Sequence, residues 1–389
     1  VLAIFGLVIA VVFRMFPAAI FPCVIQVPLA VVVGIVLRRS GARLLLPSIV
    51  ALVLMYLAVI FGDVGWLGSF NVAMAGLPVM MWVFILLGYC FVASVLPVGV
   101  LLQPRDYINA LQLVTALGLI VIGLFVAGLF GGAPVDGTRP PLEIVAPLAD
   151  FDPPGAPLLL PFLFITIACG AISGFHCLVA SGTTSKQIRS ETDAVSIGYG
   201  AMILEGFLAV LVILACVAGL GLGVAEADGG VVTGEAAWAT RYTSWDAAGG
   251  LGAKVGAFVD GASNFLAAMA VPTSVALAFM GVFVASFAAT TLDTACRLQR
   301  YVVQELASSA SDRWRAAAWS LPGRYIATGI AVVLGAALAA IPASGDAWTW
   351  ETTGTGGLIL WPLFGATNQL LAGLAFLVIA FFLWRGGRP

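Results

Sequence analysis

The sequence predicts an all-α membrane protein, a bundle of about ten transmembrane helices in one domain over residues 1–389. Of its residues 61% are hydrophobic and only 9% are charged, whereas a soluble domain carries about 25% charged residues. The apolar runs continue for about 20 residues, enough to cross about 30 Å of hydrocarbon as a helix. A transmembrane barrel would need alternating strands of about 10 residues, a pattern that these continuous runs do not fit.

Ten apolar runs bounded by charged or turn-forming residues are the candidate helices. They cover roughly 1–13, 16–37, 45–62, 79–102, 107–130, 158–183, 195–222, 263–289, 326–342 and 358–384. The first is too short to span a bilayer, and a hairpin at Arg14 separates it from the second. Because no basic region or small-residue cleavage site accompanies it, we interpret it as a clipped segment rather than a signal peptide.

Basic residues are distributed unevenly between alternate connections. One set of connections holds 13 of the 17 Lys and Arg residues, and the other holds only Arg14, Arg139, Arg241 and Lys254. The positive-inside rule places the richer set in the cytoplasm, so both ends of the chain are expected there. Residues 290–325 then form a cytoplasmic loop, and residues 131–157 and 223–262 form extracytoplasmic loops, as linkers or as lids over an entrance.

The six cysteines give no sign of a disulfide framework or a metal site. All lie in or next to apolar runs, and none forms a CxxC pair or a Cys/His ligand spacing. We therefore expect small residues packed between helices, no metal and no cofactor. Membrane lipid is an expected partner, and nucleic acid is not.

The run 158–183 carries the features most suggestive of a working site. Gly170 and Gly174 are four residues apart with Ser173 between them, a spacing that suits close helix packing and also local unwinding, because glycine destabilises a helix by about 1 kcal/mol. Unwound backbone inside a membrane can hold an anion on its N–H groups or a cation on its carbonyls. The candidate substrate-binding residues are Gly170, Ser173, Gly174, Phe175, Ser181, Thr183 and Thr184.

Two ionisable residues in apolar runs are candidates for coupling transport to protons. His176 is the chain's single histidine, and an imidazole exchanges a proton near neutral pH; alternatively, a neutral ring could pin two helices together. Glu205 is the only acidic residue well inside a run, where burying an ionised carboxylate costs about 3 kcal/mol or more. It could equally be a protonated structural group.

Further polar residues are candidates for a gate or for structural contacts. Asp293 and Arg297 are four residues apart, so they could pair along one helix, and Thr291 lies beside them. Pro97 should kink the fourth run, because it lacks a backbone donor. The amides Asn368 and Gln369, near the start of the last run, are typical of bridges between helices.

Five stretches of the chain resemble the carbon starvation protein A family of bacterial inner-membrane carriers. They are Trp82-Val-Phe-Ile with Ala93-Ser-Val-Leu-Pro97; Leu102-Gln-Pro-Arg105-Asp106-Tyr107; Pro161 to His176 with Ser181-Gly-Thr-Thr184; Glu191-Thr-Asp193 with Ile197-Gly-Tyr-Gly-Ala-Met202; and Trp361-Pro-Leu-Phe-Gly-Ala-Thr-Asn368-Gln369. These motifs are long, and they cover most of residues 80–375.

The resemblance implies secondary active import of peptides, or of pyruvate-like carboxylates with protons, during nutrient starvation. It also implies an inverted-repeat fold of the LeuT type with broken helices, and an inner-membrane location. Members of the family begin with further membrane segments that are absent here, so the chain is similar to an N-terminally truncated member. A substrate carboxylate would then rest on the backbone between Gly170 and Gly174.

Two other functions compete with transport. A membrane sensor or a non-transporting subunit would fit a truncated chain. An intramembrane serine protease would use Ser173 as its nucleophile, with His176 within reach as the base. Such proteases place the serine and the histidine on separate helices, and the glycine here lies three residues before Ser173 rather than two. We therefore expect no enzymatic activity.

Overall fold

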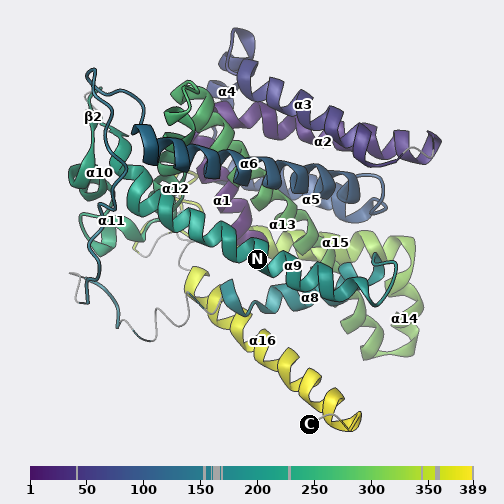
Figure 1. The fold of residues 1–389 in the computed structure, drawn as a ribbon. Coiled ribbons are helices and arrows are strands. Elements are labelled where there is room, and N and C mark those ends of the chain that lie inside the picture. Colours follow the sequence, from purple (N-terminus) through teal and green to yellow (C-terminus); the bar gives the residue numbers. More distant parts are fainter. Residues whose placement is uncertain are drawn as a thin grey trace.

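The computed structural model describes residues 1–389 except 41–42, 152–154, 159, 161–166, 168–169, 227–228, 343–344, 355–359 and 388–389. Helices make up nearly all the regular structure of this described part (Figure 1). They are α1 (Leu2–Met15), η1 (Pro17–Ala19), α2 (Ile20–Ser40), α3 (Leu45–Phe61), α4 (Trp66–Ala75), α5 (Val79–Val95), α6 (Leu102–Phe130), α8 (Gly174–Gly182), η2 (Thr184–Lys186), α9 (Asp193–Leu214), η3 (Ala215–Gly219), η4 (Leu220–Leu222), α10 (Gly234–Arg241), α11 (Trp245–Gly249), α12 (Leu251–Ala268), α13 (Thr273–Ala310), α14 (Asp312–Trp319), α15 (Leu321–Ala339) and α16 (Leu360–Arg385). The predicted all-α membrane bundle is confirmed.

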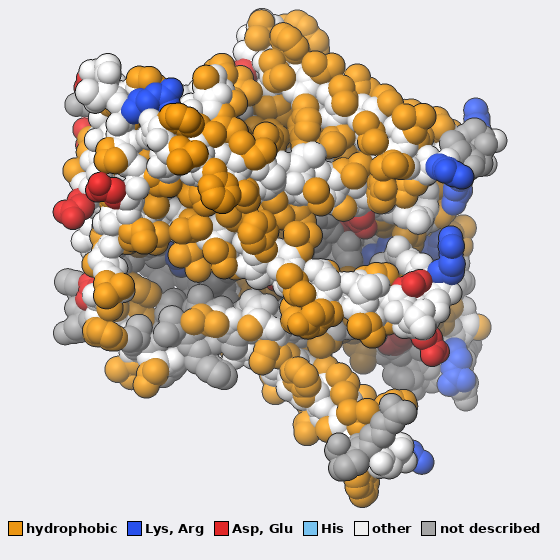
Figure 2. Space-filling view, in the orientation of Figure 1, with side chains coloured by type: hydrophobic (Ala, Val, Ile, Leu, Met, Phe, Trp, Pro, Cys, Tyr) orange, Lys and Arg blue, Asp and Glu red, His pale blue; other side chains and the backbone are white. Residues whose placement is uncertain are grey.

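Six of the described helices are long and apolar enough to cross a membrane. The pair α3 and α4, bent by 85° between them, would make a seventh. Apolar side chains cover most of the face drawn in Figure 2, and most of the Lys and Arg on that face lie at one end of the bundle. This pattern suits a protein whose flanks face lipid and whose basic end faces water.

Helix α1 lies at the centre of the bundle. Its side chains Leu7, Ile9 and Val12 are almost fully buried, and it packs against α5, α12, α13 and α15. The ring of Phe13 lies 4.8 Å from that of Trp82 on α5, centroid to centroid. A helix that is apolar on all sides is either buried in protein or exposed to lipid; the surrounding helices place this one in the core.

The predicted apolar run 263–289 is wrong as a single helix. Helix α12 ends at Ala268, Ala270 adopts a φ of 63°, and α13 begins at Thr273 after Pro272. Hydropathy joins the two helices because the sequence is apolar on both sides of the break. A proline that fixes the entry to a helix is the local signal for it.

The two connections predicted as loops at 223–262 and 290–325 contain helices, and their sides of the membrane stay a prediction. Residues 290–310 continue α13, and α14 and the start of α15 occupy most of what remains to 325. Residues 223–262 contain the antiparallel strands β1 (Val224–Ala225) and β2 (Val231–Val232), then α10, α11 and most of α12. An ion pair between Arg241 and Asp260 ties α10 to α12. A charged residue is therefore a poor predictor of a helix end when its charge is paired with a residue of another helix.

Candidate functional site

The apolar run that contains His176 is broken just before α8. Residues 170–171 are helical, but Ser173 has extended backbone with ψ at 122°. Its hydroxyl accepts a hydrogen bond from the backbone N–H of His176 at 3.4 Å, so Ser173 caps the new helix. The glycine on each side of this serine lowers the cost of the interruption.

Asn368 of α16 closes the break from the facing helix. Its Oδ1 accepts the backbone N–H of Phe175 at 2.6 Å, and its Nδ2 donates to the Ser173 hydroxyl at 3.1 Å. Asn368 is buried. Its amide bridges α8 and α16 and accepts a backbone N–H that has no partner within α8.

Gly174 allows α8 and α16 to approach closely. A Cβ atom there would lie 2.7 Å from Leu371 Cβ and 2.8 Å from Ala372 N, and against the backbone oxygen of Asn368. Gly170, by contrast, has open space around its Cβ position among the described residues. Within the described part of the chain, Gly174 makes the close helix contact that this spacing suggests, and Gly170 makes none.

A cavity of about 360 Å³ adjoins this cluster. Phe175 and Asn368 line it together with Leu2 of α1 and Phe364 of α16. The size is within the range of small-molecule sites, which are mostly apolar with a few placed polar groups.

The other predicted binding and coupling residues lie outside this cavity. His176 and Glu205 are exposed on α8 and α9 and line neither described cavity. Ser181 donates to the backbone of its own helix at Cys177 and borders a second cavity. Thr183 and Thr184 end α8 and begin η2. The roles assigned to these residues stay predictions.

Asp293 does not pair with Arg297, which corrects that expectation. Its carboxylate instead forms an ion pair with Arg105 of α6 and accepts the Tyr89 hydroxyl of α5 at 2.8 Å. Arg105 also donates to the Tyr89 oxygen at 2.7 Å. Arg105 and Arg297 are both buried, but the guanidinium of Arg297 donates to backbone carbonyls of the α5 end, so Asp293 pairs with the more distant arginine. Thr291 donates to the backbone oxygen of Phe287 in its own helix.

Arg297 instead caps the end of α5. Its Nη2 donates to the carbonyls of Ala93 and Leu96 at 2.9 and 2.6 Å, and Arg300 Nη1 donates to that of Ser94 at 2.6 Å. Pro97 ends α5 rather than kinking it, because a residue that precedes proline, here Leu96, favours extended backbone. Guanidinium groups at a helix C-terminus satisfy its carbonyls and its dipole.

Sequence reasoning missed Arg105 and Tyr89, and also a buried polar cluster between α2, α6 and α13. In that cluster Gln26 donates to Asn109, Asn109 donates to the Ser286 carbonyl at 3.2 Å, and the Ser286 hydroxyl donates to Gln26 at 3.2 Å. The sequence signal that could have found these residues is a single polar residue within an apolar run. Arg105 did not stand out in this way, because it lies only three residues after the start of α6 at Leu102 and so resembles a charged residue at the end of a span.

The fold consists of apolar helices with polar groups buried between them, and one apolar run is interrupted at Ser173, which caps the helix that follows. These features define a polytopic helical membrane protein with broken helices. The family described as carbon starvation protein CstA matches the chain over residues 1–389. The chain therefore belongs to this family, as its motifs suggested. No solved structure gives a significant match to it.

Curated relatives of the chain are named as transporters, not as enzymes. It is 31% identical to the peptide transporter CstA of Mycobacterium tuberculosis (strain H37Rv), over all of this chain and 53% of the relative. It is 34% identical to the peptide transporter CstA of Escherichia coli K12, over 78% of this chain and 45% of the relative. The pyruvate/proton symporter BtsT of E. coli K12 is 36% identical over 55% of this chain and 29% of its own length. The chain thus spans about half the length of the peptide transporters that it matches.

Proposed function

We propose that this chain takes part in proton-coupled uptake of a small carboxylate, either pyruvate or a peptide, across a bacterial inner membrane. The names of the relatives support both substrate classes. The excess of basic residues in alternate connections supports a cytoplasmic location for both ends of the chain. The observation that carries the proposal is the bond from the Phe175 N–H to Asn368 beside a cavity.

A substrate carboxylate would take the position that the Asn368 oxygen now occupies. The N–H groups of Phe175 and His176 belong to the first turn of α8, and they point toward Asn368 Oδ1 and the Ser173 hydroxyl. The positive end of the helix dipole and its unpaired N–H groups favour an anion there. The amide side chain would withdraw when substrate arrives, and it would close the break when substrate leaves.

Asn368→Asp should strongly reduce uptake of an anionic substrate while leaving the fold intact. The carboxylate keeps an acceptor for the Phe175 N–H, and the Ser173 hydroxyl can donate to it, so the bridge between α8 and α16 persists. Its charge would repel and replace the substrate carboxylate. We expect pyruvate or peptide uptake by expressing cells to fall at least about 10-fold, or about 1.4 kcal/mol of binding.

The controls for Asn368→Asp are the amount of protein in the membrane and its melting temperature in detergent, both expected to match the wild type. Uptake of both radiolabelled pyruvate and a labelled dipeptide identifies the substrate class. Full uptake of both by a well-folded Asn368→Asp protein would contradict a carboxylate site at the start of α8.

The proton carrier is tested separately at His176 and Glu205. We expect His176→Gln or Glu205→Gln to abolish uptake driven by an imposed pH gradient, because neither glutamine side chain can release a proton. Exchange of labelled for unlabelled substrate, which needs no net proton movement, should continue. A residue whose replacement leaves gradient-driven uptake unchanged is not the carrier.

A further inference from the structure

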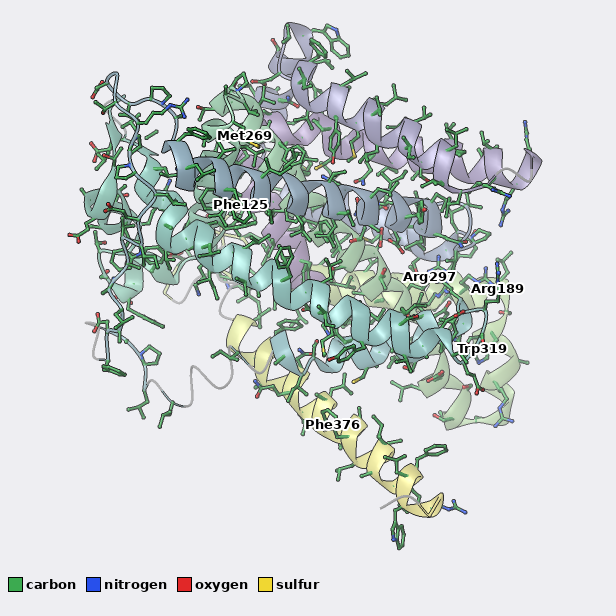
Figure 3. All side chains as sticks on the ribbon, in the orientation of Figure 1. Phe125, Arg189, Met269, Arg297, Trp319 and Phe376 are labelled. Atoms are coloured by element: carbon green, nitrogen blue, oxygen red, sulfur yellow. The ribbon has the colours of Figure 1, made fainter. Side chains whose placement is uncertain are left out.

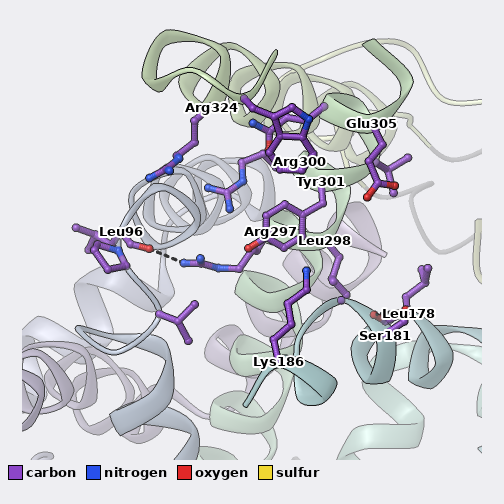
Figure 4. Close-up of a pocket in the computed structure, with 16 residues that line it drawn as sticks. Leu96, Leu178, Ser181, Lys186, Arg297, Leu298, Arg300, Tyr301, Glu305 and Arg324 are labelled. Atoms are coloured by element: carbon purple, nitrogen blue, oxygen red, sulfur yellow. Dashed lines mark hydrogen bonds between the residues drawn. The ribbon is translucent and has the colours of Figure 1, made fainter. Parts of the chain in front are cut away.

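A second cavity, larger than the one beside the α8 break, lies at the basic end of the bundle. It measures about 670 Å³ and opens where the ends of α5 and α8 meet α13, α14 and α15 (Figure 4). Figure 3 shows Arg189, Arg297 and Trp319 at this end, whereas Phe376 of α16 lies far from it. The two cavities share Leu178 of α8, but this one is lined by Ser181 and Gly182 at the end of the helix, whereas the other is lined by Phe175 at its start.

Four cations line this cavity against a single carboxylate. The cations are Lys186, Arg297, Arg300 and Arg324, and the carboxylate is Glu305. The ion pairs found in the described residues are Arg105–Asp293 and Arg241–Asp260, so no described carboxylate is paired with any of the four cations. Without an anion between them, these positively charged side chains would repel one another.

The two arginines of α13 are fixed and buried, with donors left over. Arg297 and Arg300 are 5% and 3% exposed, and the guanidinium of each donates hydrogen bonds to carbonyls at the end of α5. The Nε of each is also buried and has no hydrogen-bond partner in the described structure. The Nε of Arg105 and of Arg241, which do not line this cavity, have no partner either, so it is the fixed positive charge of Arg297 and Arg300 at the cavity wall that favours an anionic ligand.

The ring of Tyr301 contacts two of the four cations, Lys186 and Arg300. Lys186 Nζ lies 5.1 Å from the centroid of the Tyr301 ring, and the Arg300 guanidinium carbon lies 4.7 Å from it. Figure 4 shows this ring between Arg297, Arg300 and Lys186. An aromatic face attracts cations and orders them without neutralising their charge. The site is thus organised for a ligand that brings negative charge.

We propose that this cavity binds a phosphate-bearing anion with at least two negative charges. A monocarboxylate would neutralise one cation of four, whereas a phosphate group presents several charged oxygens that suit the arginine fork. The volume accommodates a phosphate with an attached group. The ligand is the headgroup of an anionic lipid or a soluble phosphate compound, since both occur at the basic end of a membrane protein.

The test uses purified protein in detergent, with inorganic pyrophosphate as the soluble probe. The variant is Lys186→Gln with Arg324→Gln, because neither side chain supports α5 as Arg297 and Arg300 do. Arg39→Gln is the matched control: it removes the same kind of charge from an exposed site on α2. Pyrophosphate should raise the melting temperature of the wild type and of the control, and its Kd should be at least 10-fold weaker for the double variant.

A second arm of the experiment identifies a lipid source. The same proteins are placed in nanodiscs of phosphatidylcholine with or without phosphatidylglycerol. Stabilisation by phosphatidylglycerol that the double variant loses, without any effect of pyrophosphate, would assign the site to a lipid headgroup. The proposal is overturned if neither probe separates the wild type from the double variant, if Arg39→Gln loses as much, or if pyruvate binds there as tightly as pyrophosphate.

Discussion

Replacing Arg105 by alanine should leave little folded protein. Asp293, its partner, is fully buried on α13 and accepts from both Arg105 and Tyr89. Removing one member of a buried ion pair leaves an uncompensated charge and costs about 3–5 kcal/mol. Because the whole free energy of unfolding of a domain is about 5–15 kcal/mol, we expect a large fall in melting temperature and in the yield of monodisperse protein in detergent.

Neutralising both partners tests whether the charge, rather than the shape, is the cause. The double variant Arg105→Gln with Asp293→Asn should be more stable than Arg105→Ala, because no unpaired charge remains. Tyr89→Phe removes two hydrogen bonds, one to Asp293 and one from Arg105, but leaves the ion pair in place, so it should cost about 1–3 kcal/mol. Arg14→Ala, at an exposed position at the end of α1, should change stability by less than about 0.5 kcal/mol. An Arg105→Ala protein as stable as Arg14→Ala would refute the pairing.

Composition and the length of the apolar runs predicted the class of fold, because a chain with so few charged residues cannot cover its surface with polar groups and must face lipid. The break before α8 was predicted from a different signal, the spacing of Gly170, Ser173 and Gly174, which weakens the helix locally. Helix α1 shows the limit of this reasoning: its side chains are apolar on all sides, so the sequence does not distinguish lipid from protein neighbours. The division between α12 and α13 was missed for a similar reason, since hydropathy carries no information about chain direction.

Residues whose partners are distant in sequence were the least predictable. Asp293 pairs with Arg105, 188 positions away in the chain, and nothing local indicates that partner over Arg297. The same holds for the arginines that cap α5 from α13. The α8 site was partly predictable, because Ser173, Gly174 and Asn368 all lie in unusual motifs. Their mutual contact was not, since it depends on how α16 packs.

Gly174→Ala should destabilise the protein, whereas Gly170→Ala should not. At Gly174 the added Cβ meets backbone of α16, including Ala372 N at 2.8 Å, and backbone cannot rotate away as a side chain can. We expect this overpacking to cost about 1–3 kcal/mol. Among the described residues nothing lies within 4 Å of the Gly170 Cβ position, and alanine favours helix by about 1 kcal/mol, so that variant should be neutral or stabilised.

Uptake should follow the contact between α8 and α16 more strictly than stability does. The added methyl group pushes α16 away from α8 and so separates Asn368 from the N–H of Phe175. Even the Gly174→Ala protein that reaches the membrane should therefore transport at least about 10-fold less substrate, which corresponds to about 1.4 kcal/mol of binding free energy. Gly170→Ala should transport normally at equal expression. Melting temperature and uptake measured on both variants separate the two effects. Equal behaviour of the two glycine variants would mean that α8 and α16 do not meet at Gly174.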